Sequence, residues 1–124
     1  MKRIEQYQRI LRRRQTVPLN GRHPIDPMLR SLLVHAAFAD AKVEPDELAV
    51  LALIIPERPI DQLEAWVATE ASKPLDFAPI RAAVPKRSDR ISLIRLVHTM
   101  VHIDQDAVSS ELTLIDNITQ ALLD

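Results

Sequence analysis

The sequence contains no cysteine and a single glycine, Gly21, in 124 residues. Without cysteine the chain cannot form disulfides, thiolate metal sites or a cysteine nucleophile. With one glycine it has no Gly-rich phosphate loop, and Asn-Gly hairpin turns are nearly excluded. Aromatic residues make up only 3% of the chain. No apolar run approaches the roughly 18 to 20 residues that span a bilayer. The residues that dominate instead are Leu, Ile and Ala, which favour helices.

The composition is that of a single globular domain, with 47% hydrophobic and 27% charged residues. The basic N-terminus lacks an apolar signal core, so we expect a cytoplasmic location. The net charge of −1 is unevenly distributed. Residues 1–30 hold eight Lys or Arg and two acidic residues, whereas residues 31–124 hold eight basic and fifteen acidic residues. This asymmetry predicts a positively charged N-terminal segment attached to a negatively charged domain.

An amphipathic helix is predicted from residue 3 to about residue 14. Its apolar positions are Ile4, Tyr7, Ile10 and Leu11, and basic side chains occupy most of the others. The stretch 15–26 contains two prolines and Gly21, so we interpret it as a linker.

Six further helical segments follow from apolar spacing, prolines and capping residues. We predict helices from 27 to about 40 and from 89 to about 104, with Asp26 and Ser88 as N-caps. Both are apolar on several sides and should be central. The other four helices are expected from Pro45 to Ile55, from the N-cap Asp61 to about Ala71, over 76–83, and from Ser109 or Ser110 to Leu123. In the last of these helices, the side chains expected to face inward are Leu112, Ile115, Ile118 and Leu122. No segment alternates with period two.

Two stretches repeat one scheme. Leu33-Val34-His35 and Leu96-Val97-His98 each precede an acidic loop, residues 40–47 and 104–111, and each loop leads into a second apolar helix. Neither half can bury its apolar face alone. The sequence therefore predicts an all-α fold, a compact bundle of about six or seven short helices with a pseudo-two-fold internal repeat that brings the two acidic loops near each other.

Residues 33–48 resemble the signature of TerB-like domains, a helix, Ala-Asp-Gly-x-hydrophobic-x-Pro-x-Glu, and a second helix. This group includes the tellurite-resistance protein TerB and the related domain of DjlA-type co-chaperones. Asp40, Val43, Pro45 and Glu47 match the pattern, whereas Ala41 replaces its glycine. The resemblance implies a TerB-like helical domain over residues 27–124, with residues 1–20 outside it as a basic helix and linker. It also implies divalent-cation binding by the acidic loops.

Carboxylates in these loops are the candidate metal ligands, with Ca²⁺ or another divalent cation as the candidate ion. Hard cations take several oxygen ligands, which residues at loop–helix junctions can supply. An EF-hand is excluded, because its sixth and twelfth positions are Pro45 and Leu51 in one loop and Ser109 and Ile115 in the other. Helix capping explains the same acidic residues without a metal. The candidate ligands are Asp40, Glu44, Glu47, Asp104, Asp106 and Glu111.

His98 and His102 form an i,i+4 pair that can place two imidazoles on one metal ion. No Glu follows His98, so the metalloprotease pattern is absent. In the competing interpretation, His98 is a hydrogen-bonded core residue, and His102 interacts favourably with the dipole at the end of its helix. His35 is likewise either a metal ligand or a hydrogen-bonded core residue. A metal-dependent hydrolase built on this pair is the one enzymatic alternative. We expect no catalytic activity.

The N-terminal basic side chains could contact phosphates of nucleic acid or an anionic membrane. Only Tyr7 is available to stack on bases, so a single-strand binding platform is missing. The apolar stripe of the same helix can dock on this domain, on a second copy or on a partner protein. The basic residues concerned are Lys2, Arg3, Arg9, Arg12, Arg13 and Arg14.

The leading functional hypothesis is a non-catalytic, TerB-like interaction or sensing domain of a bacterial stress or envelope-associated system, whose acidic loops bind a divalent cation or a basic surface of a partner. The alternative is a metal-free structural adaptor that uses its basic N-terminal helix for self-assembly or for docking on a protein partner.

Overall fold

The computed structural model describes residues 2–13, 23–39, 44–103 and 109–123, with the backbone alone for 109–111. Within these ranges every regular element is a helix, which confirms the all-α prediction. No described helix has the length and apolarity needed to cross a membrane. The helices are α1 (Lys2–Arg13), α2 (Asp26–Ala37), α3 (Pro45–Ile54), α4 (Ile60–Ala71), α5 (Ala78–Ala83), α6 (Arg87–Val101) and α7 (Ser109–Leu123).

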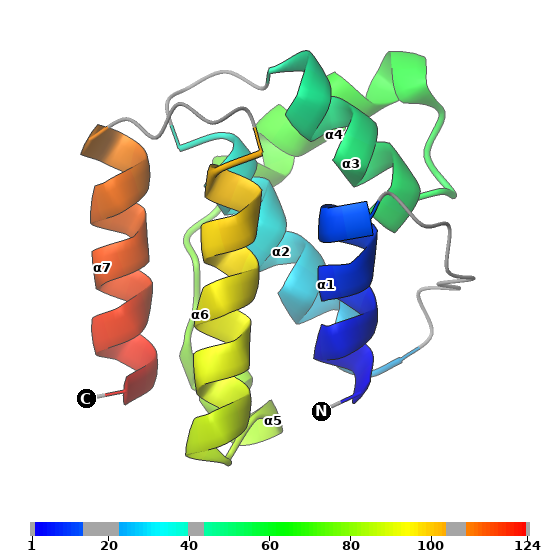
Figure 1. Ribbon diagram of the computed structural model, residues 1–124. Coiled ribbons are helices and arrows are strands. Elements are labelled where there is room, and N and C mark those ends of the chain that lie inside the picture. The colour runs from blue at the N-terminus through cyan, green and yellow to red at the C-terminus, as the bar shows by residue number, and fades with distance from the viewer. Residues whose placement is uncertain (1, 14–22, 40–43, 104–108, 124) are drawn as a thin grey trace.

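Helices α2 and α6 are central, as predicted. α6 lies between α1 and α7 and also packs on α2, while the other side of α2 contacts α3 and α4 (Figure 1). Leu29, Leu32 and Leu33 of α2 and Leu93 and Leu96 of α6 are completely buried. Because each of these helices has neighbours on several sides, its apolar residues extend around most of its circumference.

Helix α1 belongs to the same core as the rest of the protein. Its side chains Ile4, Tyr7, Ile10 and Leu11 are at most 2% exposed. α1 runs beside α6 in the same direction, whereas α7 runs in the opposite direction (Figure 1). The sequence-based division assigned residues 1–20 and 27–124 to separate units, yet α1 and α6 share one apolar interface. The apolar stripe of α1 is therefore docked within its own chain.

A buried carboxylate fastens α1 to the start of α2. Asp26 is 1% exposed. Its Oδ1 accepts hydrogen bonds from Arg3 Nε at 2.7 Å and from the Tyr7 hydroxyl at 3.0 Å, and its Oδ2 accepts from Arg3 Nη2 at 2.6 Å and from the backbone N–H of His23 at 3.2 Å. The predicted N-cap role of Asp26 is wrong. The N-cap of α2 is Ile25, whose hydrocarbon side chain cannot accept a capping bond. The Asp26 side chain is directed to α1 instead.

These contacts fix the protonation states of the group. Burial opposes ionisation of Asp26, but the hydrogen bonds from Arg3 and Tyr7, together with the charge of Arg3, outweigh it and hold the pKa of this carboxyl below its usual value. Burial, followed by the charge of Asp26, raises the pKa of Tyr7 far above its usual value. At neutral pH the hydroxyl is therefore a donor and the carboxylate an acceptor.

Other local predictions were also wrong. The N-caps of α4 and α6 are Pro59 and Lys86 rather than Asp61 and Ser88. Both residues already have the extended backbone that precedes a helix, with φ −60° and ψ 142° for Pro59 and φ −79° and ψ 133° for Lys86. Leu112, expected to face inward, is 47% exposed.

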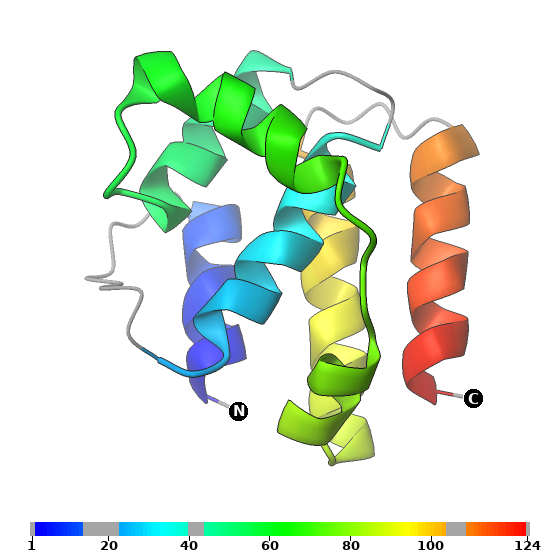
Figure 2. The same ribbon diagram turned by 180° about the vertical axis from the view of Figure 1, so that it is seen from behind.

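One arginine joins three helix ends at the base of the bundle. The guanidinium of Arg90 on α6 donates to the carbonyl oxygens of Val84 at 2.7 Å, Arg81 at 2.9 Å and Leu122 at 3.2 Å. A cation at the carbonyl ends of α5 and α7 satisfies unpaired acceptors and complements the helix dipoles. The opposite side of the molecule shows α4 and the extended segment 72–77 running down to α5 (Figure 2).

We predict that Asp26→Asn lowers the free energy of unfolding by about 3 kcal/mol, because it leaves the guanidinium of Arg3 without its buried counter-charge. Urea denaturation followed by circular dichroism measures this loss. Tyr7→Phe, which removes only the hydroxyl, should cost about half as much.

The effect of Asp26→Asn should depend on pH. A carboxyl whose pKa is lowered by folding contributes its full stabilisation above its unfolded pKa of about 3.9 and loses it as the pH falls through the folded value. The stability gap between wild type and Asp26→Asn should therefore be constant near neutrality and shrink below about pH 4. A gap that is the same in acid and at neutral pH would show that the charge of Asp26 does not carry the effect.

Candidate functional site

The helix ends that flank the two acidic loops lie at one end of the molecule. The last turns of α2 and α6 and the first turns of α3 and α7 all lie in the upper part of Figure 1. Of the predicted cation ligands, the structure describes only the side chains of Glu44 and Glu47. The others lie outside the described residues or side chains and are Asp40, Asp104, Asp106 and Glu111.

Glu44 and Glu47 form a capping box at the start of α3. Glu44 is the N-cap, and its side chain accepts a hydrogen bond from the backbone N–H of Glu47. In return Glu47 Oε1 accepts from the backbone N–H of Glu44 at 3.1 Å, and the Glu47 side chain is only 2% exposed. This reciprocal pairing satisfies two amides that the helix leaves unpaired. In the described part of the chain, no three His, Cys, Asp or Glu side chains come together as a metal site.

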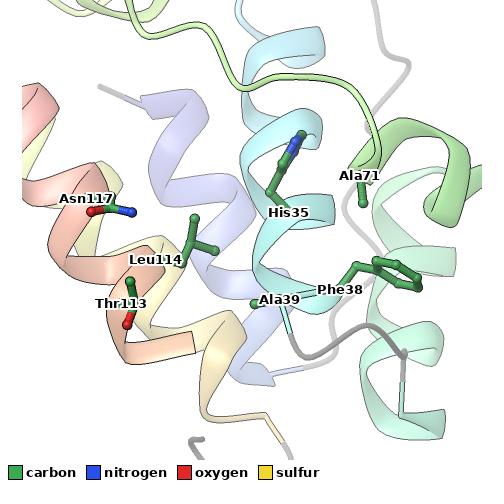
Figure 3. Close-up of a pocket in the computed structure, with 7 residues that line it drawn as sticks. All are labelled: His35, Phe38, Ala39, Ala71, Thr113, Leu114 and Asn117. Atoms are coloured by element: carbon green, nitrogen blue, oxygen red, sulfur yellow. The ribbon is translucent and has the colours of Figure 1, made fainter. Parts of the chain in front are cut away.

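A shallow groove of about 270 Å³ lies between the end of α2 and the first half of α7. His35, Phe38 and Ala39 line one side with Ala71 of α4, and α7 lines the other with Thr113, Leu114 and Asn117 (Figure 3). The ring of His35 is already engaged, with Nδ1 2.7 Å from the carbonyl oxygen of Ser31 and Nε2 2.8 Å from that of Lys73. Both ring nitrogens face carbonyl oxygens, and the ring bridges residue 73 to α2.

His98 and His102 lie on the outer side of α6 and are both exposed. The prediction of a core position for His98 is wrong. The buried side of α6 is formed by other residues, among them Val97, Met100 and Val101, and the His98 side chain is exposed to solvent. The two imidazole rings stack, with centroids 4.5 Å apart and planes 3° apart. His102 Nδ1 lies 2.8 Å from the carbonyl oxygen of His98.

The exposed sides of α1 and α6 form a surface rich in guanidinium groups, which we call the arginine face. It consists of Arg9, Arg12, Arg13 and Arg95, and all four side chains are exposed. No ion pair within the described residues neutralises any of them. Arg3, which the sequence grouped with this set, is instead turned toward Asp26. Of the other two members, Lys2 is exposed at the start of α1 and Arg14 lies outside the described residues.

Two adjoining hollows mark the arginine face. One, of about 390 Å³, lies along α1, and the other, of about 200 Å³, lies between α1 and α6. Both are lined by Glu5, Gln8 and Arg12. Among the described residues, Glu5 is the single carboxylate that lines either one. The Gln8 amide bonds the Thr99 hydroxyl at 2.9 Å and, in its better-satisfied orientation, also accepts from Arg12, which joins the two helices beneath the hollows.

Sequence reasoning found the α1 part of this face but missed Arg95. The signal was present, because Arg95, His98 and His102 recur at three- and four-residue spacing and therefore share one side of a helix. Tertiary packing decides which helix lies next to that side of α6. The sequence pattern carries no information on this packing.

Comparison of the chain with protein-family models, with curated proteins and with solved structures finds no significant match.

We predict that Glu47→Gln leaves stability nearly unchanged, whereas Glu47→Ala lowers the free energy of unfolding by at least about 1 kcal/mol. Glutamine at the third helical position can still accept from the N-cap amide, but alanine cannot. Chemical denaturation of both variants tests this. Equal losses for Gln and Ala would indicate that the negative charge of Glu47, rather than its hydrogen bond, stabilises α3.

Proposed function

We propose that this protein is a non-catalytic helical interaction domain that binds an acidic segment of a partner protein through its arginine face. The observation that carries the proposal is the set of exposed guanidinium groups of α1 and α6 around two hollows whose described lining contains one carboxylate, Glu5. Such groups form paired hydrogen bonds with carboxylates. A partner with several Asp or Glu side chains would supply the missing counter-charges.

The packing of α1 supports this use of its polar side. Its apolar residues are buried against α6 and α3, so that side of the helix is unavailable to a partner without unfolding the core. A partner can therefore contact α1 only through its polar side, which is exposed to solvent. The burial of the apolar side of α1 favours the adaptor hypothesis in a modified form. In this form α1 binds a partner as an integral part of the folded domain.

An acidic protein segment suits this surface better than nucleic acid. The net charge of the whole chain is −1, whereas nucleic-acid-binding domains are usually strongly basic. Exposed carboxylates of Glu57, Asp61 and Glu64 belong to the α4 side of the molecule, which faces away from α1 and α6 (Figure 2). A short acidic segment interacts mainly with the local charge, because ions screen charges farther than about 10 Å at 0.1 M salt.

Cation binding by a TerB-like pair of loops is a second candidate. Its support is that the helix ends flanking both loops lie at the same end of the molecule (Figure 1). A cation held there would stabilise the native state by mass action. Addition of Ca²⁺ or Mg²⁺ at millimolar concentration should then raise the melting temperature, and an unchanged melting curve would favour the metal-free adaptor.

We predict that a fluorescent peptide of about ten glutamates binds the protein at low salt, and that Arg9→Glu/Arg13→Glu weakens binding about tenfold. Each exposed ion pair contributes up to about 1 kcal/mol, and reversal of the charge adds repulsion. Fluorescence anisotropy measures both affinities. Arg12 is left intact because it contacts Gln8 inside the interface of α1 and α6.

The matched control is Lys73→Glu/Lys86→Glu, which changes the net charge equally at exposed positions away from the arginine face. This variant should retain the wild-type affinity within about twofold. If both double variants weaken peptide binding equally, the loss of affinity comes from the change in net charge alone, which would contradict the proposal. Tighter binding of a 12-base-pair DNA duplex than of the peptide would identify the surface as a nucleic-acid site instead.

A further inference from the structure

We propose that His98 and His102 together bind one divalent transition-metal ion on the surface of α6, at a site separate from the acidic loops. The two residues are one helical turn apart on the same side of the helix, and both are exposed to solvent. Their rings already stack, with centroids 4.5 Å apart and nearly parallel planes. The arrangement needs only side-chain rotation to direct one nitrogen of each ring at a common ion.

The hydrogen bonding of the pair leaves nitrogen lone pairs available. His102 Nδ1 lies 2.8 Å from the carbonyl oxygen of His98, which can only accept, so this nitrogen carries the proton and Nε2 has the free lone pair. A backbone carbonyl on the second ring nitrogen is also the usual outer contact of a metal-bound histidine. Within the described residues, neither ring nitrogen of His98 has a hydrogen-bond partner. By contrast, both nitrogens of His35 are engaged with carbonyl oxygens.

The ligand type predicts which ions bind. Imidazole nitrogen suits Cu²⁺, Ni²⁺ and Zn²⁺, with Cu²⁺ bound most tightly, whereas Ca²⁺ and Mg²⁺ prefer several oxygen ligands. Two histidines fill two coordination positions, and water fills the rest. Arg95 lies one turn before His98 on the same side of α6, and its positive charge opposes cation binding. Neutralisation of Arg95 should therefore tighten the complex.

The experiment titrates the untagged full-length protein at neutral pH with CuCl₂, NiCl₂, ZnCl₂ and CaCl₂, followed by isothermal calorimetry and by NMR of the histidine ring protons. We expect one Cu²⁺ or Ni²⁺ ion per chain, with resonance changes confined to His98 and His102, and weaker or no binding of Ca²⁺. His98→Gln and His102→Gln should each lower the affinity at least tenfold, since loss of outer-shell contacts alone costs about 10- to 100-fold.

Three comparisons make the result decisive. His23→Gln, at another exposed histidine, should leave the affinity unchanged, and Arg95→Gln should raise it. Circular dichroism should show that all variants keep the wild-type helical signal. The proposal is overturned if no transition metal binds at millimolar concentration, or if binding survives in His98→Gln and His102→Gln. The titration uses no peptide, so its outcome is independent of partner binding by the arginine face.

Discussion

The buried contact of Asp26 with Arg3 and Tyr7 determines which surface this protein presents. It ties the beginning of α1 to the beginning of α2, and thereby sets the rotation of α1 about its axis. With Tyr7 and its apolar neighbours turned inward, Arg9, Arg12 and Arg13 are turned outward beside α6. Ionic groups are costly to bury, and a buried carboxylate is tolerated here because four hydrogen bonds satisfy it. One interaction thus links core packing to the composition of the surface.

The features that the sequence predicted well are those set by local chemistry and by apolar periodicity. Pro45 begins α3 as expected, and the two most uniformly apolar helices are central, because an all-round apolar helix must have neighbours on several sides. Asp26 shows where this reasoning ends. Its residue type and position both favour an N-cap, but a guanidinium 23 residues earlier in the chain competes for the same oxygens. Local propensity carries no information about such a partner.

In the candidate sites, too, local sequence predicts some features and tertiary packing decides the others. Glu47 stands where the cation hypothesis and the capping hypothesis both place a carboxylate, and the structure describes the capping contacts. The outward direction of His98 was indicated by Arg95, one turn earlier on the same side of α6, but the neighbouring apolar positions Ile94 and Val101 favoured a core position. Arg95 joins the surface of α1 only through the packing of two helices more than seventy residues apart in sequence. Spacing identifies the residues that share a helix side, and tertiary contacts decide which sides become one surface.

The small net charge conceals a local concentration of positive charge. Four exposed guanidinium groups gather on the arginine face of α1 and α6, the cationic side of the molecule. Around α4 the two signs are interspersed, because Glu57 pairs with Arg30, Glu70 pairs with Lys73, and Arg58 lies over Trp66. Salt screens the arginine face from these more distant charges, so the face acts on its own surroundings. The histidine pair belongs to the cationic side, so a metal ion bound there must gain enough from two imidazole nitrogens to offset repulsion by Arg95. That requirement selects ions with strong nitrogen affinity and disfavours the hard cations that the acidic loops would attract.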